Sequence, residues 1–122
     1  MVPRIKKRAD FLKVSHQGVK ARMRHFTVLC ARQNETPSLG TRIGFTASKR
    51  VGNAVYRNRA KRRMRTLVDT LLLHYAGQFY KDHTEVSLDF VIIAHNTIID
   101  ADRKLLEVDF QKAALSCISR IK

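Results

Sequence analysis

The chain has 122 residues, 44% of them hydrophobic, and a formal net charge of +14 at pH 7. This length fits one domain with one core, and no Pro-, Gly- or Ser-rich linker divides it, so we predict a single domain over residues 1–122. The longest clearly apolar run, Phe90 to Ala94, is too short for a membrane span, and the polar residues after the basic N-terminus argue against a secretory signal peptide. We expect a cytoplasmic protein in which Cys30 and Cys117 are buried thiols, with a single disulfide between them as the alternative.

The first predicted element is a short helix over residues 8–16, with Phe11 on its apolar side. Residues 19–33 follow as two strand pieces, separated by a polar segment, where the chain turns, at Arg22 and Arg24.

A loop at residues 34–40 then leads into a half-buried strand at residues 41–48. Because Phe26 and Phe45 alternate with polar residues in their strands, we assign both to core packing, with the lining of a binding cleft as the alternative. Gly44 leaves a gap on the polar face of its strand, where a ligand or another backbone could approach.

A long helix is predicted from the N-cap Asn53 to about Tyr75, before Gly77. Spacing at 100° per residue predicts an apolar face made of Tyr56, Ala60, Met64, Leu67, Val68, Leu71 and Tyr75. The opposite face consists of Asn58, Arg59, Arg62 and Arg65. Between the two faces lie Arg57, Lys61 and Arg63, whose stems can cover apolar surface while their charged heads reach outward.

The last two predicted elements are a buried inner strand at residues 88–94 and a closing helix at residues 108–121. The closing helix is expected to bury Phe110, Ala114, Leu115, Ile118 and Ile121. Asp100 and Asp102 are expected to cap a helical stretch at residues 103–106. The whole pattern predicts an α+β fold, with a roughly four-stranded sheet packed against helices in the order α-β-β-β-α-β-α.

The positive charge is concentrated in the first half of the chain. Residues 1–68 contain eighteen Lys or Arg and two acids, whereas residues 69–122 contain six and eight. The segment from Lys49 to Arg65 alone has eight Lys or Arg and no carboxylate. A solvated helix face usually interleaves acids with bases, whereas like charges here destabilise the helix and oppose its macrodipole. An arriving phosphate relieves both penalties, so we predict that this segment binds nucleic acid.

The same region carries a long spaced motif, R-x-G-x4-K-x2-G-x-A-V-x-R-N-x2-K-R-x2-R. It is formed by Arg42, Gly44, Lys49, Gly52, Ala54, Val55, Arg57, Asn58, Lys61, Arg62 and Arg65. This spacing resembles the "RNR" signature of the bacterial ribonuclease P protein component. The order of elements, an Asp10-Phe11 pair and the Ile-Ile-Ala end of the inner strand extend the resemblance over essentially the whole chain.

The resemblance implies a subunit of a ribonucleoprotein endonuclease that removes the 5′ leader of precursor tRNA by hydrolysis. In that family the RNA subunit carries the active site and its magnesium ions, so no residue of this chain is expected to be catalytic. The protein binds the catalytic RNA and the leader and strengthens the use of metal, with no membrane and no further protein partner. The family fold also implies a left-handed βαβ crossover, which general rules would not predict.

Two groups of binding residues follow from the resemblance. Contacts to the catalytic RNA are expected from Lys49, Arg50, Asn53, Arg57, Asn58, Arg59, Lys61, Arg62, Arg63 and Arg65. A cleft for the leader is expected between the first helix and the sheet, at Phe11, Arg22, Arg24 and Arg42. Many relatives have a second aromatic residue where this chain has Ser15, which shifts the expected leader contacts towards the arginines and the backbone.

Three alternatives to this hypothesis stay open at the level of sequence. The five histidines lack metal-ligand spacing, but a metal-independent ribonuclease that uses two histidines and a lysine is one alternative. A structural RNA-binding protein would share the charge and size but not the motif. Sequence-specific DNA binding is weaker, because no helix-turn-helix pair or zinc ligands accompany the arginine helix.

Overall fold

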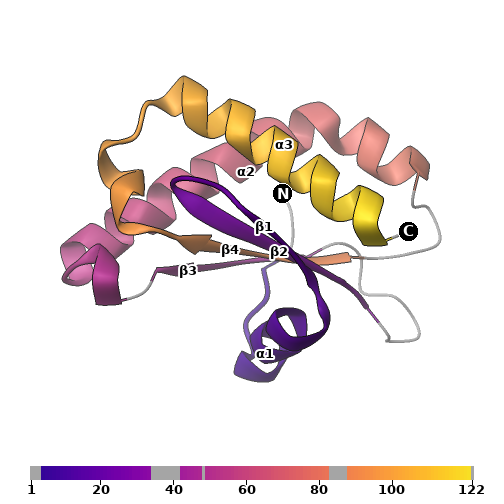
Figure 1. Ribbon diagram of the computed structural model, residues 1–122, viewed down its shortest axis with the longest axis horizontal. Coiled ribbons are helices and arrows are strands. Elements are labelled where there is room, and N and C mark those ends of the chain that lie inside the picture. The colour runs from indigo at the N-terminus through magenta and orange to yellow at the C-terminus, as the bar shows by residue number, and fades with distance from the viewer. Residues whose placement is uncertain (1–3, 34–41, 48, 83–87, 122) are drawn as a thin grey trace.

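A mixed four-stranded sheet forms the middle layer, with α1 on one face and α2 and α3 on the other (Figure 1). The computed structural model describes residues 4–33, 42–47, 49–82 and 88–121. The elements are α1 (Arg8–Gln17), β1 (Val19–Arg22), β2 (Phe26–Arg32), β3 (Arg42–Ala47), η1 (Lys49–Val51), α2 (Ala54–Asp82), β4 (Leu88–Ala94), η2 (Asn96–Asp100) and α3 (Arg103–Ile121). The predicted fold class and element order are confirmed, while the loop predicted at residues 34–40 lies outside the described residues.

The strand order in the sheet is β1-β2-β4-β3. β2 pairs antiparallel with both β1 and β4, whereas β3 pairs parallel with β4. The predicted inner position of β4 is therefore confirmed, and α2 is the connection of a parallel β3-α2-β4 unit. The left hand of this crossover stays a prediction.

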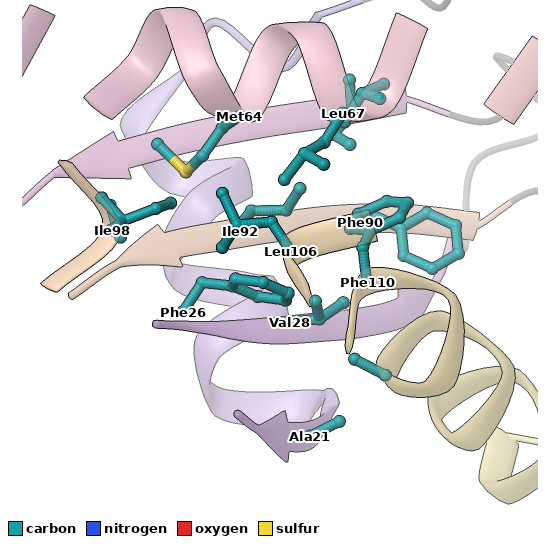
Figure 2. Close-up of a cluster of buried hydrophobic side chains, with 14 of the residues drawn as sticks. Ala21, Phe26, Val28, Met64, Leu67, Phe90, Ile92, Ile98, Leu106 and Phe110 are labelled. Atoms are coloured by element: carbon teal, nitrogen blue, oxygen red, sulfur yellow. The ribbon is translucent and has the colours of Figure 1, made fainter. Parts of the chain in front are cut away.

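The main core lies between the sheet and the two longer helices. Figure 2 shows Met64 and Leu67 of α2 pointing towards Ile92 and Phe90 of β4. From α3, Leu106 and Phe110 fill the same layer, and the Phe110 ring centroid lies 6.3 Å from that of Phe26. Each fully buried side chain of this size contributes about 1.5–3 kcal/mol by leaving water, so this layer fixes α2 on the sheet.

A second, smaller core joins α1 to the opposite face of the sheet. It consists of Ile5, Val14, Leu29, Ala31 and Val91, with Phe11 and Ile93 partly buried against it. A Cβ on Gly44 would lie 2.6 Å from Cε1 of Phe11, so only glycine leaves room for this ring. The gap predicted at Gly44 is thus filled by a side chain of the same protein, and the expectation of a ligand or backbone there is wrong.

The start of α2 is as predicted, but its end and one of its core positions are not. The Oδ1 atom of Asn53 accepts hydrogen bonds from the N–H groups of Val55 at 3.1 Å and Tyr56 at 3.2 Å, which confirms the N-cap. The helix continues past Gly77 to Asp82, because one interior glycine costs only about 1 kcal/mol against the turns on either side. Tyr56 is 45% exposed, so its assignment to the core is wrong.

The closing helix α3 begins at Arg103, five residues earlier than predicted. Oδ1 of Asp102 accepts a hydrogen bond from the Lys104 N–H at 3.3 Å, so Asp102 is the cap, whereas Asp100 lies in η2. Leu115 is 47% exposed because Ala113, Ala114 and Cys117 occupy the inner face at that level. The core assignments of Phe110, Ala114 and Ile118 are confirmed, as is the prediction that both cysteines are buried free thiols.

Candidate nucleic-acid interface

Five cations of η1 and α2 form an exposed one-signed surface, here named the basic surface. Its members are Arg50, Arg59, Lys61, Arg62 and Arg65, while Asn53 and Asn58 are exposed beside them and Arg57 is half-buried. The first acid after this stretch, Asp69, pairs with Arg4 at 3.7 Å, so it does not neutralise the cations of the basic surface. Burial of Ala60, Met64 and Leu67 on the other side of α2 turns these cations outward. The face that was predicted to bind phosphate therefore exists as an exposed cationic surface. The Lys49 side chain lies outside the described part.

Arg63 differs from its neighbours in α2. Its Nη1 donates to the carbonyl oxygens of Ile98 and Ile99 at 2.7 and 2.6 Å, and its Nη2 donates to that of Ala101 at 2.6 Å. The prediction that the charged head of Arg63 reaches outward is wrong, because η2 presents three carbonyl acceptors to it. Arg63 therefore fixes η2 against α2 through three hydrogen bonds of its guanidinium, and its predicted contact with the RNA stays a prediction.

A cavity of about 490 Å³ lies between α1 and the sheet. Its lining residues are Lys6, Arg8, Phe11, Leu12, Ser15, Leu29, Phe45, Thr46 and Ile93. Phe11 and Ser15 thus lie at the predicted cleft, and two cations that sequence reasoning did not select, Lys6 and Arg8, lie at its edge. Phe26 is fully buried as predicted, whereas Phe45 packs only partly against the main core and also lines this cavity.

A second cavity of similar volume, about 490 Å³, continues from the first along the sheet. It is lined by Arg22, Arg24, Thr27, Arg50, Ile93, Ala94, His95, Asn96 and Thr97. Ile93 lines both cavities and pairs in register with Thr46 on one side and Thr27 on the other, and Thr27 pairs with Arg22. We name the two together the sheet cleft: it has a mostly apolar end under α1 and a basic end beside η1.

Histidine hydrogen bonds fix the basic end of the sheet cleft. Nδ1 of His25 bonds with the Thr97 hydroxyl at 2.7 Å, and Nε2 of His95 bonds with the Thr27 hydroxyl at 2.9 Å. Nδ1 of His95 lies 3.2 Å from the carbonyl oxygen of Arg24. Burial, assisted by the charge of Arg24, lowers the pKa of His25 below 6.5, so this ring is neutral at pH 7. The bonds join β2 to the start of η2 and give both rings a structural role.

Arg42 lines neither cavity, and its guanidinium is bound to two acids. Its Nε and Nη2 donate to the two oxygens of Asp89 at 2.9 and 2.7 Å, and its Nη1 lies 3.4 Å from Oδ2 of Asp10. Asp89 is 3% exposed and also accepts from Nε2 of Gln33 at 2.7 Å. Although Arg42 lies between α1 and the sheet, its guanidinium neutralises a buried carboxylate and ties α1, through Asp10, to β3 and β4. Its contact with the leader stays a prediction.

The four residues predicted for the leader cleft are therefore distributed over three places. Phe11 lies at the apolar end of the sheet cleft, Arg22 and Arg24 lie at the basic end, and Arg42 lies in the acid network. Thr27, His95 and Thr97 were missed, because their proximity depends on the pairing of β2 with β4. The only signal in the sequence was the polar run that follows the inner strand.

The carboxylates of α1 and the sheet are engaged by an arginine. Asp10 belongs to α1 and Asp89 to β4, and both are bonded to Arg42. Among the described residues, no three His, Cys, Asp or Glu side chains are grouped closely enough to hold a metal ion.

Across the described ranges, no helix is long and apolar enough to cross a membrane.

Comparison with known proteins shows which family this chain resembles in sequence and structure. Residues 2–117 match the protein family described as Ribonuclease P. The ribonuclease P protein component of Paramagnetospirillum magneticum is 36% identical over 117 residues, which cover 90% of this chain and 78% of that protein. The component of Bacillus cereus strain Q1 is 34% identical over 96% of both chains.

Solved structures agree with the sequence relatives. The RNase P protein of Staphylococcus aureus has a TM-score of 0.67 at 26% identity and covers 99% of this chain and 98% of its own. The RNase P protein of Thermotoga maritima, with a TM-score of 0.63 at 20% identity over 89% of this chain and 92% of its own, supports the fold alone. With its motif, its element order and these matches, the chain belongs to the ribonuclease P protein family.

Proposed function

We propose that the chain is the RNA-binding protein subunit of a bacterial ribonuclease P, acting in the cytoplasm on precursor tRNA. It binds the catalytic RNA through the basic surface and the 5′ leader through the sheet cleft. The RNA subunit holds the magnesium ions and cleaves the phosphodiester bond. No further protein partner is required. The observation that carries the proposal is the uncompensated basic surface on the motif helix of a ribonuclease P family member.

The basic surface supports the contact with the catalytic RNA. Each cation that neutralises a phosphate releases a condensed counterion, so several cations on one helix give tight and salt-dependent binding. The exposed amides of Asn53 and Asn58 add hydrogen-bonding groups beside the charges. Structured RNA is recognised largely through its shape and its phosphate and 2′-hydroxyl groups, which a helix with several exposed cations can contact.

The sheet cleft supports the contact with the leader. Its apolar end offers the half-buried ring of Phe11 to a base, and its basic end offers Arg22, Arg24 and Arg50 to phosphates. Single-stranded nucleic acid is bound by this combination of a stacking ring and a positive groove. Arg50 belongs to both the basic surface and the cleft, so the two RNA ligands meet at η1.

The carboxylates of the chain take no part in holding magnesium in this proposal. Asp10 and Asp89 are bonded to Arg42, and no carboxylate is among the described residues that line the sheet cleft, whereas proteins hold hard divalent cations chiefly through carboxylate oxygens. The protein contributes binding and orientation, and the magnesium ions supply the Lewis-acid chemistry from their sites on the RNA.

The proposal is tested with the full chain and a transcribed bacterial ribonuclease P RNA. Affinity of the complex is measured for precursor tRNA with and without a 5′ leader. Phe11→Ala should weaken binding of the leader-bearing RNA by about five- to one-hundredfold, as expected for one stacked base, and leave leaderless tRNA unchanged. Val108→Ala, at a 47% exposed position of α3 outside the cleft, is the matched control.

Three other outcomes would contradict parts of the proposal. Equal loss for leader-bearing and leaderless RNA in Phe11→Ala would assign Phe11 to folding instead, through its packing on Gly44. RNA binding without any preference for a leader in the wild type would favour a structural RNA-binding protein. Cleavage by the protein alone would favour a polypeptide ribonuclease.

A further inference from the structure

Tyr56 is an exposed aromatic residue in the first turn of α2. It is 45% exposed, and its neighbour Val55 is 65% exposed. Helical spacing predicts Tyr56 in the core, yet it lies on the surface because the core contacts of α2 begin one turn later, at Ala60. An apolar ring is therefore held in water within the most cationic segment of the protein.

The ring of Tyr56 packs against the turn that precedes the helix. Gly52 has a φ of +133°, and a Cβ at this position would lie 3.0 Å from Cδ2 and 3.1 Å from Cβ of Tyr56. The absence of a side chain on Gly52 thus lets Tyr56 lie against the backbone. A supported ring loses little conformational freedom on binding, and a tyrosine carries only two side-chain torsions.

The charges around Tyr56 restrict the kind of molecule that can cover it. The guanidinium carbon of Arg59 lies 6.0 Å from the ring centroid, Arg57 follows Tyr56 in the same turn, and the exposed Arg50 lies just before the helix. An apolar protein surface would have to desolvate these cations, whereas a nucleotide offers a flat base for the ring and phosphates for the charges.

We propose that Tyr56 is a stacking platform for an unpaired nucleobase of the RNA subunit. This inference rests on the proposed function, because it adds a base contact to the surface that binds the catalytic RNA. Bases inside a duplex are already stacked on their neighbours, so the contact selects a bulge, loop or junction of the RNA. The contact lies on α2, separate from Phe11 in the sheet cleft.

The first test measures the affinity of the full chain for a bacterial ribonuclease P RNA over a range of salt concentrations. Tyr56→Ala and Tyr56→Leu should each bind about five- to one-hundredfold more weakly, and Tyr56→Phe should bind within about twofold of the wild type. The slope of log affinity against log salt should stay unchanged in all three, because no phosphate contact is removed. Leu115→Ala, at a 47% exposed position of α3, controls for the loss of an exposed apolar side chain.

The second measurement uses the absence of tryptophan from the sequence. Tyr56→Trp introduces the sole indole fluorophore at the proposed contact, and its emission should be quenched when the ribonuclease P RNA binds. Leu115→Trp carries the fluorophore at a comparable exposure away from the basic surface and should respond little. A blunt RNA duplex of similar length should bind through its phosphates without quenching Tyr56→Trp.

The outcomes separate this inference from the proposed function. Wild-type affinity in Tyr56→Ala, equal affinities of Tyr56→Leu and Tyr56→Phe, or unchanged indole emission of Tyr56→Trp on RNA binding would each overturn the stacking role while leaving the RNA subunit as the partner. Failure of the wild-type chain to bind the RNA would overturn both. Thermal unfolding of Tyr56→Ala should match that of the wild type, since alanine favours the helix at an exposed position.

Discussion

Removal of the Arg42 guanidinium should destabilise the fold far more than removal of an exposed cation. Arg42 holds both oxygens of Asp89 at 2.9 and 2.7 Å, and the two side chains are only 13% and 4% exposed. In Arg42→Ala the Asp89 carboxylate stays buried without its counter-charge, and a buried pair broken in this way costs about 3–5 kcal/mol. For a domain of this size the melting temperature should fall by about 10–20 °C.

Urea unfolding followed by circular dichroism measures this change in the free energy of unfolding. Arg42→Ala/Asp89→Asn should be more stable than Arg42→Ala, because the neutral amide removes the unpaired charge and its oxygen can still accept from Gln33. Glu107→Gln is the control: it removes an exposed helix pair, Arg103 with Glu107 at 3.4 Å, and should cost less than about 0.5 kcal/mol.

The opposite result would refute this reasoning. If Arg42→Ala unfolds within about 1 kcal/mol of the wild type but binds leader-bearing RNA much more weakly, Arg42 is a ligand of the RNA. A double variant that is less stable than Arg42→Ala would likewise show that the Asp89 charge is not the source of the loss.

Three further predictions concern charge, pH and thiol chemistry. Replacement of Arg59, Arg62 and Arg65 by Ala should reduce the slope of log affinity against log salt by about 2 to 3 units, as measured by filter binding, whereas Arg63→Ala should mainly lower the melting temperature because it releases η2. Burial holds the pKa of His25 below 6.5 in the folded state, so the unfolded chain binds more protons than the folded chain just below that pH. The melting temperature should therefore decrease as the pH is lowered from about 7.5 to about 5.5, and it should decrease less in His25→Gln. Burial raises the pKa of both cysteine thiols, so neither should react with a disulfide reagent until the protein unfolds; rapid reaction of the folded chain would contradict their burial.

The element order could be predicted because it is encoded locally. The alternation in β2 and β3, the apolar β4 and the capping side chains of Asn53 and Asp102 are visible in short windows of sequence. The order β1-β2-β4-β3 depends on which strands meet after the chain closes, and nothing within a single strand reports it. The separation of the four predicted cleft residues into three places follows from this strand order.

What sequence reasoning missed at single residues also has a physical pattern. Arg42 and Arg63 resemble other cations of the chain, but their acceptors lie 47 and 35 positions away. A helical wheel likewise treats every apolar residue as a core residue, although contact with the sheet begins only at Ala60 in α2. Tyr56 and Leu115 were misassigned because the wheel records the angle of a residue and not what stands opposite it.

Cleavage of a precursor tRNA at low magnesium concentration is the decisive measurement for a protein subunit that assists a catalytic RNA. The purified chain, a bacterial ribonuclease P RNA and their mixture are assayed side by side. We predict that the leader is removed only in the mixture, because the protein strengthens binding and the RNA performs the chemistry. Cleavage by the protein alone, or a mixture no more active than the RNA alone although the two bind each other, would contradict this prediction.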